Sequence, residues 1–151
     1  RFDVGQEAGA MSAAAQRGLL LFRDKARCTK CHSGFNFTDE KFHNAGIGWD
    51  TNTVDLGRYM VSKNTEDIGA FKTPTLREIA RSAPYMHDGR FKTLEEVVNF
   101  YNQGGIKNPH MDPLVIPLEL TDEEKRDLVQ FLHTLNGEGW QQATAPKSFP
   151  K

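Results

Sequence analysis

Apolar residues recur at helical spacing in three stretches of the chain, and each stretch predicts a helix. The first, at about residues 11–24, joins an alanine run to four consecutive apolar residues that are good helix formers. The other two, at 94–103 and 122–135, each follow a Thr-x-x-Glu sequence, which is the capping box of a helix N-terminus. Glycine-containing pairs follow both of them and predict their ends.

Two local features refine this pattern. Gly18 interrupts the first helix, where a glycine costs about 1 kcal/mol, so we expect another helix to approach closely there, with the first and last helices crossing at this residue. Pro74 suits the first position of a helix and Thr73 suits its cap. These residues predict a further short helix that ends near Arg81, followed by a turn over residues 82–89.

The remaining stretches predict loops and tails. Residues 33–68 are rich in glycine and asparagine breaks, and residues 106–120 contain three prolines. A long loop in a compact domain is usually functional. No stretch predicts a strand, so the expected fold is all-α with long irregular loops. We expect one domain at 10–137, an N-terminal tail at 1–9 and a C-terminal tail at 138–151, anchored by Trp140.

Both cysteines of the chain lie in the sequence Cys28-Thr29-Lys30-Cys31-His32. C-x-x-C-H is the attachment signal for c-type haem. The two thiols add to the two vinyl groups of the porphyrin, and the short spacer lets both reach one edge of the ring. His32 then donates an imidazole nitrogen as the proximal ligand of the iron. The sequence therefore predicts one covalent haem c.

Other uses of a cysteine pair fit less well. A structural zinc site takes four ligands, usually from two separated pairs, and the other four histidines lack the expected spacing. A redox C-x-x-C favours a βαβ setting, which the pattern does not show. A disulfide would leave His32 unexplained. His43 and Trp49 lie in the long loop. Metal ligation is the functional role considered for His43 and electron hopping is the one considered for Trp49, and packing is the alternative for both.

Composition limits the classes of partner and location. The chain has 151 residues, with 19 Lys and Arg against 20 Asp and Glu, so neither nucleic acid nor an anionic membrane is predicted as its main partner. No run approaches the roughly 20 apolar residues of a membrane span. No signal peptide is visible and the sequence starts at Arg1, which indicates a processed product. Because haem c is attached outside the cytoplasm in bacteria, we expect a periplasmic protein.

The chain resembles the C-terminal haem domain of bacterial dihaem cytochrome c peroxidases and of their relative MauG. The segments that carry the resemblance share their order and gaps with that family, and they cover most of residues 18–137. They are Cys28 to His32, Phe37 to Asp39, Phe42 to Asn44, Asp55 to Arg58, Phe71 to Arg77, Ala83 to Gly89, Thr93 to Tyr101 and Leu120 to Gly137. The resemblance implies a class I cytochrome c-like haem domain.

The resemblance also implies a distal ligand for the iron. The peroxidases place a methionine 14 positions after the histidine of the His-Asp-Gly turn, whereas MauG has a tyrosine there. Counting from His87, that position is Tyr101 (101 − 87 = 14). A phenolate stabilises ferric iron, whereas a methionine raises the potential. Met86 and Met111 are the alternative ligands, and a packed, hydrogen-bonded Tyr101 is the alternative role for the tyrosine.

Further roles follow for neighbouring residues. Arg77 offers a guanidinium fork for a haem propionate, or else a solvated surface charge. By resemblance, His87 lies near the propionates, and the carbonyls of Ser82 and Pro84 contribute to a calcium site shared with a second domain. MauG passes radicals through a tryptophan two places before its first haem cysteine, and this chain has Ala26 there.

The expected function is electron transfer by a haem domain that works with a redox partner protein or a second haem domain. The family members carry two C-x-x-C-H motifs and this chain carries one. The alternative is a peroxidase or MauG-like oxidase unit that reacts with hydrogen peroxide, alone or beside a second haem domain.

Overall fold

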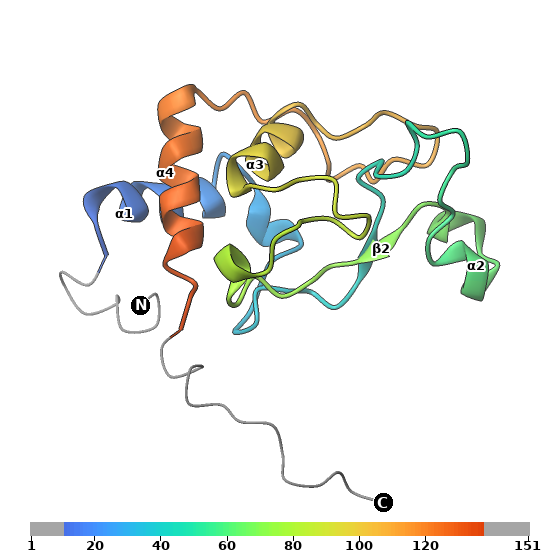
Figure 1. The fold of residues 1–151 in the computed structure, drawn as a ribbon, viewed down its shortest axis with the longest axis horizontal. Coiled ribbons are helices and arrows are strands. Elements are labelled where there is room, and N and C mark those ends of the chain that lie inside the picture. Colours follow the sequence, from blue (N-terminus) through green and yellow to red (C-terminus); the bar gives the residue numbers. More distant parts are fainter. Residues whose placement is uncertain (1–10, 138–151) are drawn as a thin grey trace, which may run out of the picture.

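The computed structural model describes residues 11–137, a mainly helical domain with long loops (Figure 1). Four α-helices, three short 3₁₀ turns and one pair of short strands follow one another along these residues. In chain order they are α1 Ala13–Arg23, η1 Cys28–Lys30, β1 Phe42–His43, α2 Tyr59–Ser62, η2 Thr65–Asp67, β2 Phe71–Lys72, η3 Ile79–Arg81, α3 Leu94–Asn102 and α4 Asp122–His133.

Helices α1 and α4 cross at Gly18, as the sequence predicted (Figure 1). A Cβ atom on Gly18 would overlap the carbonyl oxygen of Asp127 and lie 2.9 Å from Cβ of Phe131. Next to the crossing, the Arg17 guanidinium donates to both carboxylate oxygens of Asp127 at 2.6 and 2.8 Å. The ring centroid of Phe22 lies 5.0 Å from that of Phe131, which is fully buried. The absence of a side chain at Gly18 therefore sets the distance between the two helices.

The two capping boxes are confirmed. Thr93 accepts a hydrogen bond from the Glu96 amide, and the Glu96 carboxylate accepts one from the Thr93 amide. Thr121 and Glu124 make the same pair of bonds at the start of α4. Helix α4 ends at His133, three residues before the Asn136-Gly137 stop that the sequence suggested.

The expected helix at Pro74 is wrong. Phe71 and Lys72 instead form β2, which pairs antiparallel with β1 in the register Phe42 to Lys72. The Thr73 amide donates to the Lys41 carbonyl at 2.8 Å, so the chain stays extended through the proposed cap. Only the 3₁₀ turn η3 forms before the turn that begins at residue 82.

The all-α description therefore needs a small correction. The domain contains the two-stranded sheet and two isolated bridges, Gly57 with Ala70 and Tyr85 with Phe91. The long loop at 33–68 is also less irregular than expected, because it contains β1, α2 and η2. Residues 106–120 carry no helix or strand, as predicted.

The core lies where α1, α3 and α4 meet the segment that follows α1. Its buried members come from these helices and from the segments beside and between them: Met11, Ala15, Phe22, Ala26, Phe37, Leu76, Tyr85, Leu94, Val98, Leu120, Leu128, Val129, Phe131, Leu132 and Leu135. Among the described residues, no helix has the length and apolar character that crossing a membrane requires. The predicted tails, with Trp140, lie outside the described residues.

Candidate cofactor cavity

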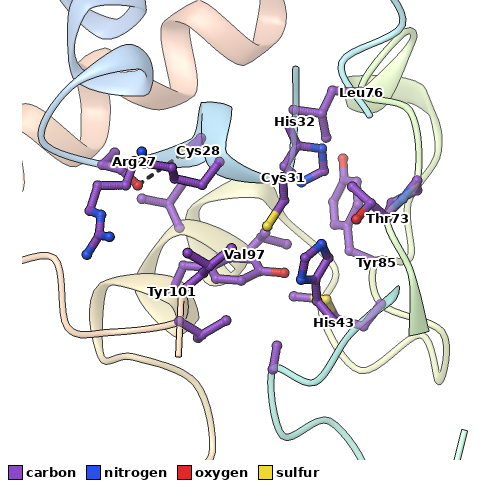
Figure 2. A pocket seen from close by; sticks show the side chains of 18 of the residues that line it. Arg27, Cys28, Cys31, His32, His43, Thr73, Leu76, Tyr85, Val97 and Tyr101 are labelled. Carbon is purple, nitrogen blue, oxygen red and sulfur yellow. Dashed lines mark hydrogen bonds between the residues drawn. The ribbon is translucent and has the colours of Figure 1, made fainter. Parts of the chain in front are cut away.

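A cavity of about 450 Å³ opens between the cysteine turn, helix α3 and the loop that precedes α4. Its lining is mainly apolar, and Figure 2 shows the side chains that converge on it. Cavities of this size and character hold cofactors and other small molecules. The apolar lining includes Phe22, Ala26, Ile47, Phe71, Leu76, Leu94, Val97, Val98, Leu114, Val115, Ile116, Leu118, Leu128 and Leu132.

Both cysteines of the motif line this cavity and neither is in a disulfide. Arg27 enters the turn η1 in the left-handed region, with φ 53°, and the His32 amide donates to the Cys28 carbonyl at 2.8 Å. This tight turn brings both sulfur atoms to one side. Burial raises the pKa of the Cys28 thiol to about 12 and that of Cys31 to about 11. The thiols are therefore neutral at pH 7, which suits an apolar site.

His32 also lines the cavity, and one of its nitrogens is already committed. Its Nδ1 lies 2.9 Å from the carbonyl oxygen of Phe37, which can only accept a hydrogen bond. Nδ1 therefore carries the proton, and Nε2 keeps a lone pair. Burial lowers the pKa of His32 and outweighs the opposing effects of its hydrogen bonds to the backbone of Phe37 and Pro74 and of the nearby Asp39 carboxylate. A neutral ring with a fixed tautomer is the state in which histidine binds metals.

Tyr101 projects from α3 into the same cavity. Its hydroxyl points toward the space between Cys31 and His43 (Figure 2). Burial raises the pKa of Tyr101 to about 12, and the two nearby cysteines add to this effect. Ligation by Tyr101 and the packed, hydrogen-bonded role both stay predictions.

The two methionines have different positions. Met86 lines the cavity and has φ 68°, in the left-handed region. Met111 is not part of the lining, and its sulfur accepts a hydrogen bond from Nδ2 of Asn108 at 3.5 Å. The structure therefore brings Tyr101 and Met86 to the cavity and leaves Met111 outside it.

His87 and Arg77, which the sequence analysis linked to the haem propionates, lie in different places relative to the cavity. His87 lines the cavity, stacks on Phe71 with 3.6 Å between ring centroids, and lies 3.2 Å from the Asp55 carboxylate. Arg77 is outside the lining, where its guanidinium donates to the Phe35 carbonyl at 2.7 and 3.0 Å. Propionate binding by either residue stays a prediction, and the geometry favours His87.

Three cations that sequence reasoning did not single out belong to the lining. They are Arg27, Lys30 and Lys72, and no aspartate or glutamate of the described chain joins them there. Arg27 and Lys30 adjoin the cysteines, so their sequence positions were a signal that could have been used. Lys72 is paired with the Glu40 carboxylate at 2.5 Å, whereas Arg27 and Lys30 place positive charge beside the cysteines, which suits an anionic group of a cofactor or of a partner.

His43 forms a bridge that the sequence did not predict. Its Nδ1 lies 2.6 Å from the Asp112 carboxylate and its Nε2 lies 2.9 Å from the Asp39 carboxylate. Burial disfavours the charged ring, but the bonds to both carboxylates outweigh it and raise the pKa of His43. Both nitrogens face carboxylates in this structure, and metal ligation by His43 stays a prediction. The i, i+4 spacing of Asp39 and His43 was the only local signal.

Replacing Asp39 by asparagine is expected to destabilise the domain above about pH 4 and to have little effect near pH 2. Burial opposes ionisation of Asp39, but bonds donated by the Lys41 amide and by His43 lower its pKa to about 2. Since this folded pKa lies below the ordinary 3.8, the carboxylate stabilises the fold fully above the unfolded value. That contribution is lost as the pH falls through the folded value.

Urea unfolding from pH 7 to pH 2 measures this difference, with Asp24→Asn as the control because Asp24 is exposed. An Asp39→Asn effect as large at pH 2 as at pH 7 would count against an ionised Asp39 in the fold.

The remaining predicted sites gain no support. Trp49 is outside the cavity lining, and its buried Nε1 has no hydrogen-bond partner among the described residues. Its ring lies 5.9 Å from that of His110. The Ser82 hydroxyl donates to the Ile79 carbonyl, and the calcium site at Ser82 and Pro84 stays a prediction. Ala26 is buried in the cavity wall.

Comparisons with known proteins show the family of this chain. The family model described as cytochrome c matches residues 15–136. The chain is 39% identical over 164 residues to the cytochrome-c peroxidase IdrP1 of Denitromonas iodatirespirans, covering 90% of this chain and 43% of that protein. It is 42% identical over 138 residues to the methylamine utilization protein MauG of Methylorubrum extorquens, covering 91% and 38%.

Solved structures give the same result. A MauG-like protein associated with microbial copper homeostasis superposes with a TM-score of 0.76 and 33% identity, over 87% of this chain and 49% of that one. The dihaem peroxidase BthA from Burkholderia thailandensis E264 superposes with a TM-score of 0.68 and 25% identity, over 86% and 44%. The chain spans less than half the length of these relatives.

Proposed function

This chain belongs to the cytochrome c family as a relative of MauG and of the dihaem cytochrome c peroxidases, and from this premise we propose that it is an electron-transfer domain with one covalent haem c. Cys28 and Cys31 would hold the group and His32 would bind its iron from the proximal side. Membership of the cytochrome c family implies a covalent haem. What we propose beyond this is that the domain holds one haem and that it transfers electrons.

The observation that carries the proposal is the convergence of three residues on one apolar cavity. Two unpaired thiols and an imidazole with its Nδ1 committed to Phe37 meet there. Each thiol would add across one vinyl double bond, with its sulfur joining one carbon and its hydrogen the other, so no oxidant is needed. When bound, the iron supplies one-electron chemistry. The protein fixes the ring orientation of His32 and excludes water with apolar side chains.

Tyr101 is our proposed distal ligand. It lies in the cavity wall, and its hydroxyl points toward the space between Cys31 and His43 (Figure 2). Because the phenol resists ionisation in this buried position, only a strong Lewis acid would remove its proton at neutral pH. A phenolate ligand favours the ferric state and implies a low potential. Met86 is the alternative within the same cavity.

Replacing Tyr101 by methionine is therefore expected to raise the reduction potential and to create the ferric absorption band of methionine ligation at about 695 nm. Redox titration and optical spectra of the haem protein measure both. Tyr85→Phe is the matched control, because Tyr85 lines the same cavity while its hydroxyl donates to the Ile79 carbonyl at 3.0 Å. A wild-type spectrum that already contains this band, or that Tyr101→Met leaves unchanged, would reject Tyr101 as the ligand.

A second function has support from the names of the relatives. Several are cytochrome-c peroxidases, so this chain is also a candidate for part of a peroxidase or MauG-like oxidase that reacts with hydrogen peroxide beside a second haem domain. Rapid mixing of the haem protein with peroxide tests this function. An unchanged spectrum without turnover would leave electron transfer as the function of this domain.

The partner and the location follow from the haem. We propose that a redox partner protein, or a second haem domain, exchanges electrons with this domain. The cationic residues Arg27 and Lys30 at the cavity suit a partner with an acidic surface. Since bacterial haem c is attached outside the cytoplasm, the proposed location is the periplasm.

A further inference from the structure

One wall of the cavity is a loop without regular structure. Residues 106–118 contain no helix or strand. They nevertheless contribute four apolar side chains to the lining, namely Leu114, Val115, Ile116 and Leu118. A wall made of such a loop keeps its shape only if other contacts hold it, because irregular backbone is the first part of a domain to open.

One set of contacts that hold this loop passes through the side chain of His43. Asp112, just before the four lining residues, bonds to Nδ1 of His43 at 2.6 Å, while Asp39 bonds to Nε2 at 2.9 Å. The side chains of Asp39, His43 and Asp112 are only 12, 15 and 17% exposed. A neutral imidazole has a single N–H. Because carboxylates only accept, two such contacts require both nitrogens to donate, which is the imidazolium form.

Backbone hydrogen bonds also connect residues 106–118 to the residues that follow His43. The Asp112 amide donates to the Asn44 carbonyl at 3.0 Å, and the Ile106 amide donates to the Ala45 carbonyl at 3.1 Å. His43 belongs to β1, where it pairs with Phe71 of β2. The loop is thus fastened to the small sheet, and the charged bridge is the only one of these contacts that joins three side chains.

The bridge also lies at the place where the cofactor would be attached. Ligand atoms of Cys31, Asp39 and His43 all lie within 4.8 Å of one another. Figure 2 shows His43 entering the cavity beside Cys31 and Tyr101. We do not assign this group of three as a metal site, because both nitrogens of His43 face carboxylates and the proposed attachment would use the sulfur of Cys31.

We propose that His43 is a positioning residue for the cofactor. As an imidazolium shared by Asp39 and Asp112, it fastens the 106–118 loop to β1 and keeps that wall of the cavity in place. The inference rests on the proposed function, because the wall matters to electron transfer only if the cavity holds haem. His43 touches no reacting atom in this scheme and acts through the loop.

Hydrogen exchange of the haem protein, followed by mass spectrometry, tests this inference. In His43→Gln we expect the backbone amides of 106–118 to exchange roughly tenfold faster or more, because charge-assisted hydrogen bonds to buried carboxylates are lost. Exchange in α1 and α4 should stay unchanged, and the cofactor absorption bands should shift or broaden. His133→Gln is the matched control, since His133 is exposed on α4.

A pair of substitutions at Asp112 gives an independent test if His43→Gln does not accumulate. Asp112→Asn keeps an oxygen acceptor opposite His43 and should retain most of the protection of 106–118. Asp112→Ala removes the acceptor and should match His43→Gln. Protection in His43→Gln or in Asp112→Ala equal to that of the wild type would overturn the inference. Wild-type protein without haem absorption would instead refute the proposed function, whatever the exchange data show.

Discussion

The double variant Cys28→Ser, Cys31→Ser is expected to carry no covalently attached haem. Both sulfur atoms line the cavity and no other cysteine exists in the chain, so no thioether can form after the exchange. A hydroxyl does not replace a thiol in this addition. Denaturing mass spectrometry and haem staining after gel electrophoresis should therefore detect the bare polypeptide. We also expect a lower unfolding temperature, because a ligand that binds only the folded state stabilises it.

Single variants and a neighbouring position provide the controls. Cys28→Ser or Cys31→Ser alone should retain haem through one thioether. Thr29→Ala changes a spacer residue of the same turn and should leave attachment intact. Covalent haem in the double variant would show that another residue binds the group and would refute the assignment.

The variant Gly18→Val is expected to lower the free energy of unfolding by about 3 kcal/mol, because overpacking at a close helix contact forces the backbone apart. Even a Cβ atom at this position would overlap the Asp127 carbonyl oxygen, which is backbone and cannot rotate away. The damage should extend to the cofactor, since Phe22 of α1 and both Leu128 and Leu132 of α4 line the cavity. Urea unfolding monitored by circular dichroism measures the loss.

Leu20→Val in the same helix is the control, because Leu20 is 58% exposed. We expect it to change stability by less than about 1 kcal/mol. Equal stabilities for the two variants would mean that the α1 and α4 crossing tolerates separation and is not set by Gly18.

Features with local causes were predictable from the sequence. The capping boxes at Thr93 and Thr121 act within one helical turn, so spacing along the chain contains all the information they need. The haem motif is equally local, because one 3₁₀ turn brings Cys28, Cys31 and His32 together. Gly18 was informative for the opposite reason, since a glycine in an otherwise favourable helix indicates an outside contact.

The errors have non-local causes. Thr73 and Pro74 suit the start of a helix, but the Thr73 amide donates to Lys41, and its carbonyl accepts from the Thr38 hydroxyl at 2.8 Å. These partners lie more than 30 positions away and cannot be read from local propensity. Strands of two residues are likewise too short to give an alternating pattern.

The His43 bridge was missed for the same reason. Its two carboxylates lie 4 and 69 positions away in sequence, and only the folded loop brings Asp112 to the ring. The bond from the Arg77 guanidinium to the Phe35 carbonyl is a further non-local contact, since the two residues lie 42 positions apart, and propionate binding by Arg77 stays a prediction. The candidate attachment residues and the candidate ligand in α3 were thus visible in the sequence and line one cavity, whereas the loop contacts around them required the structure.

The most direct test of the account is the intact mass of the wild-type chain, measured under denaturing conditions after expression in a host that attaches haem c, together with its absorption spectrum. We predict the mass of the polypeptide plus one haem, with a Soret band that stays with the denatured chain. The mass of the polypeptide alone, without that band, would contradict the assignment of Cys28, Cys31 and His32.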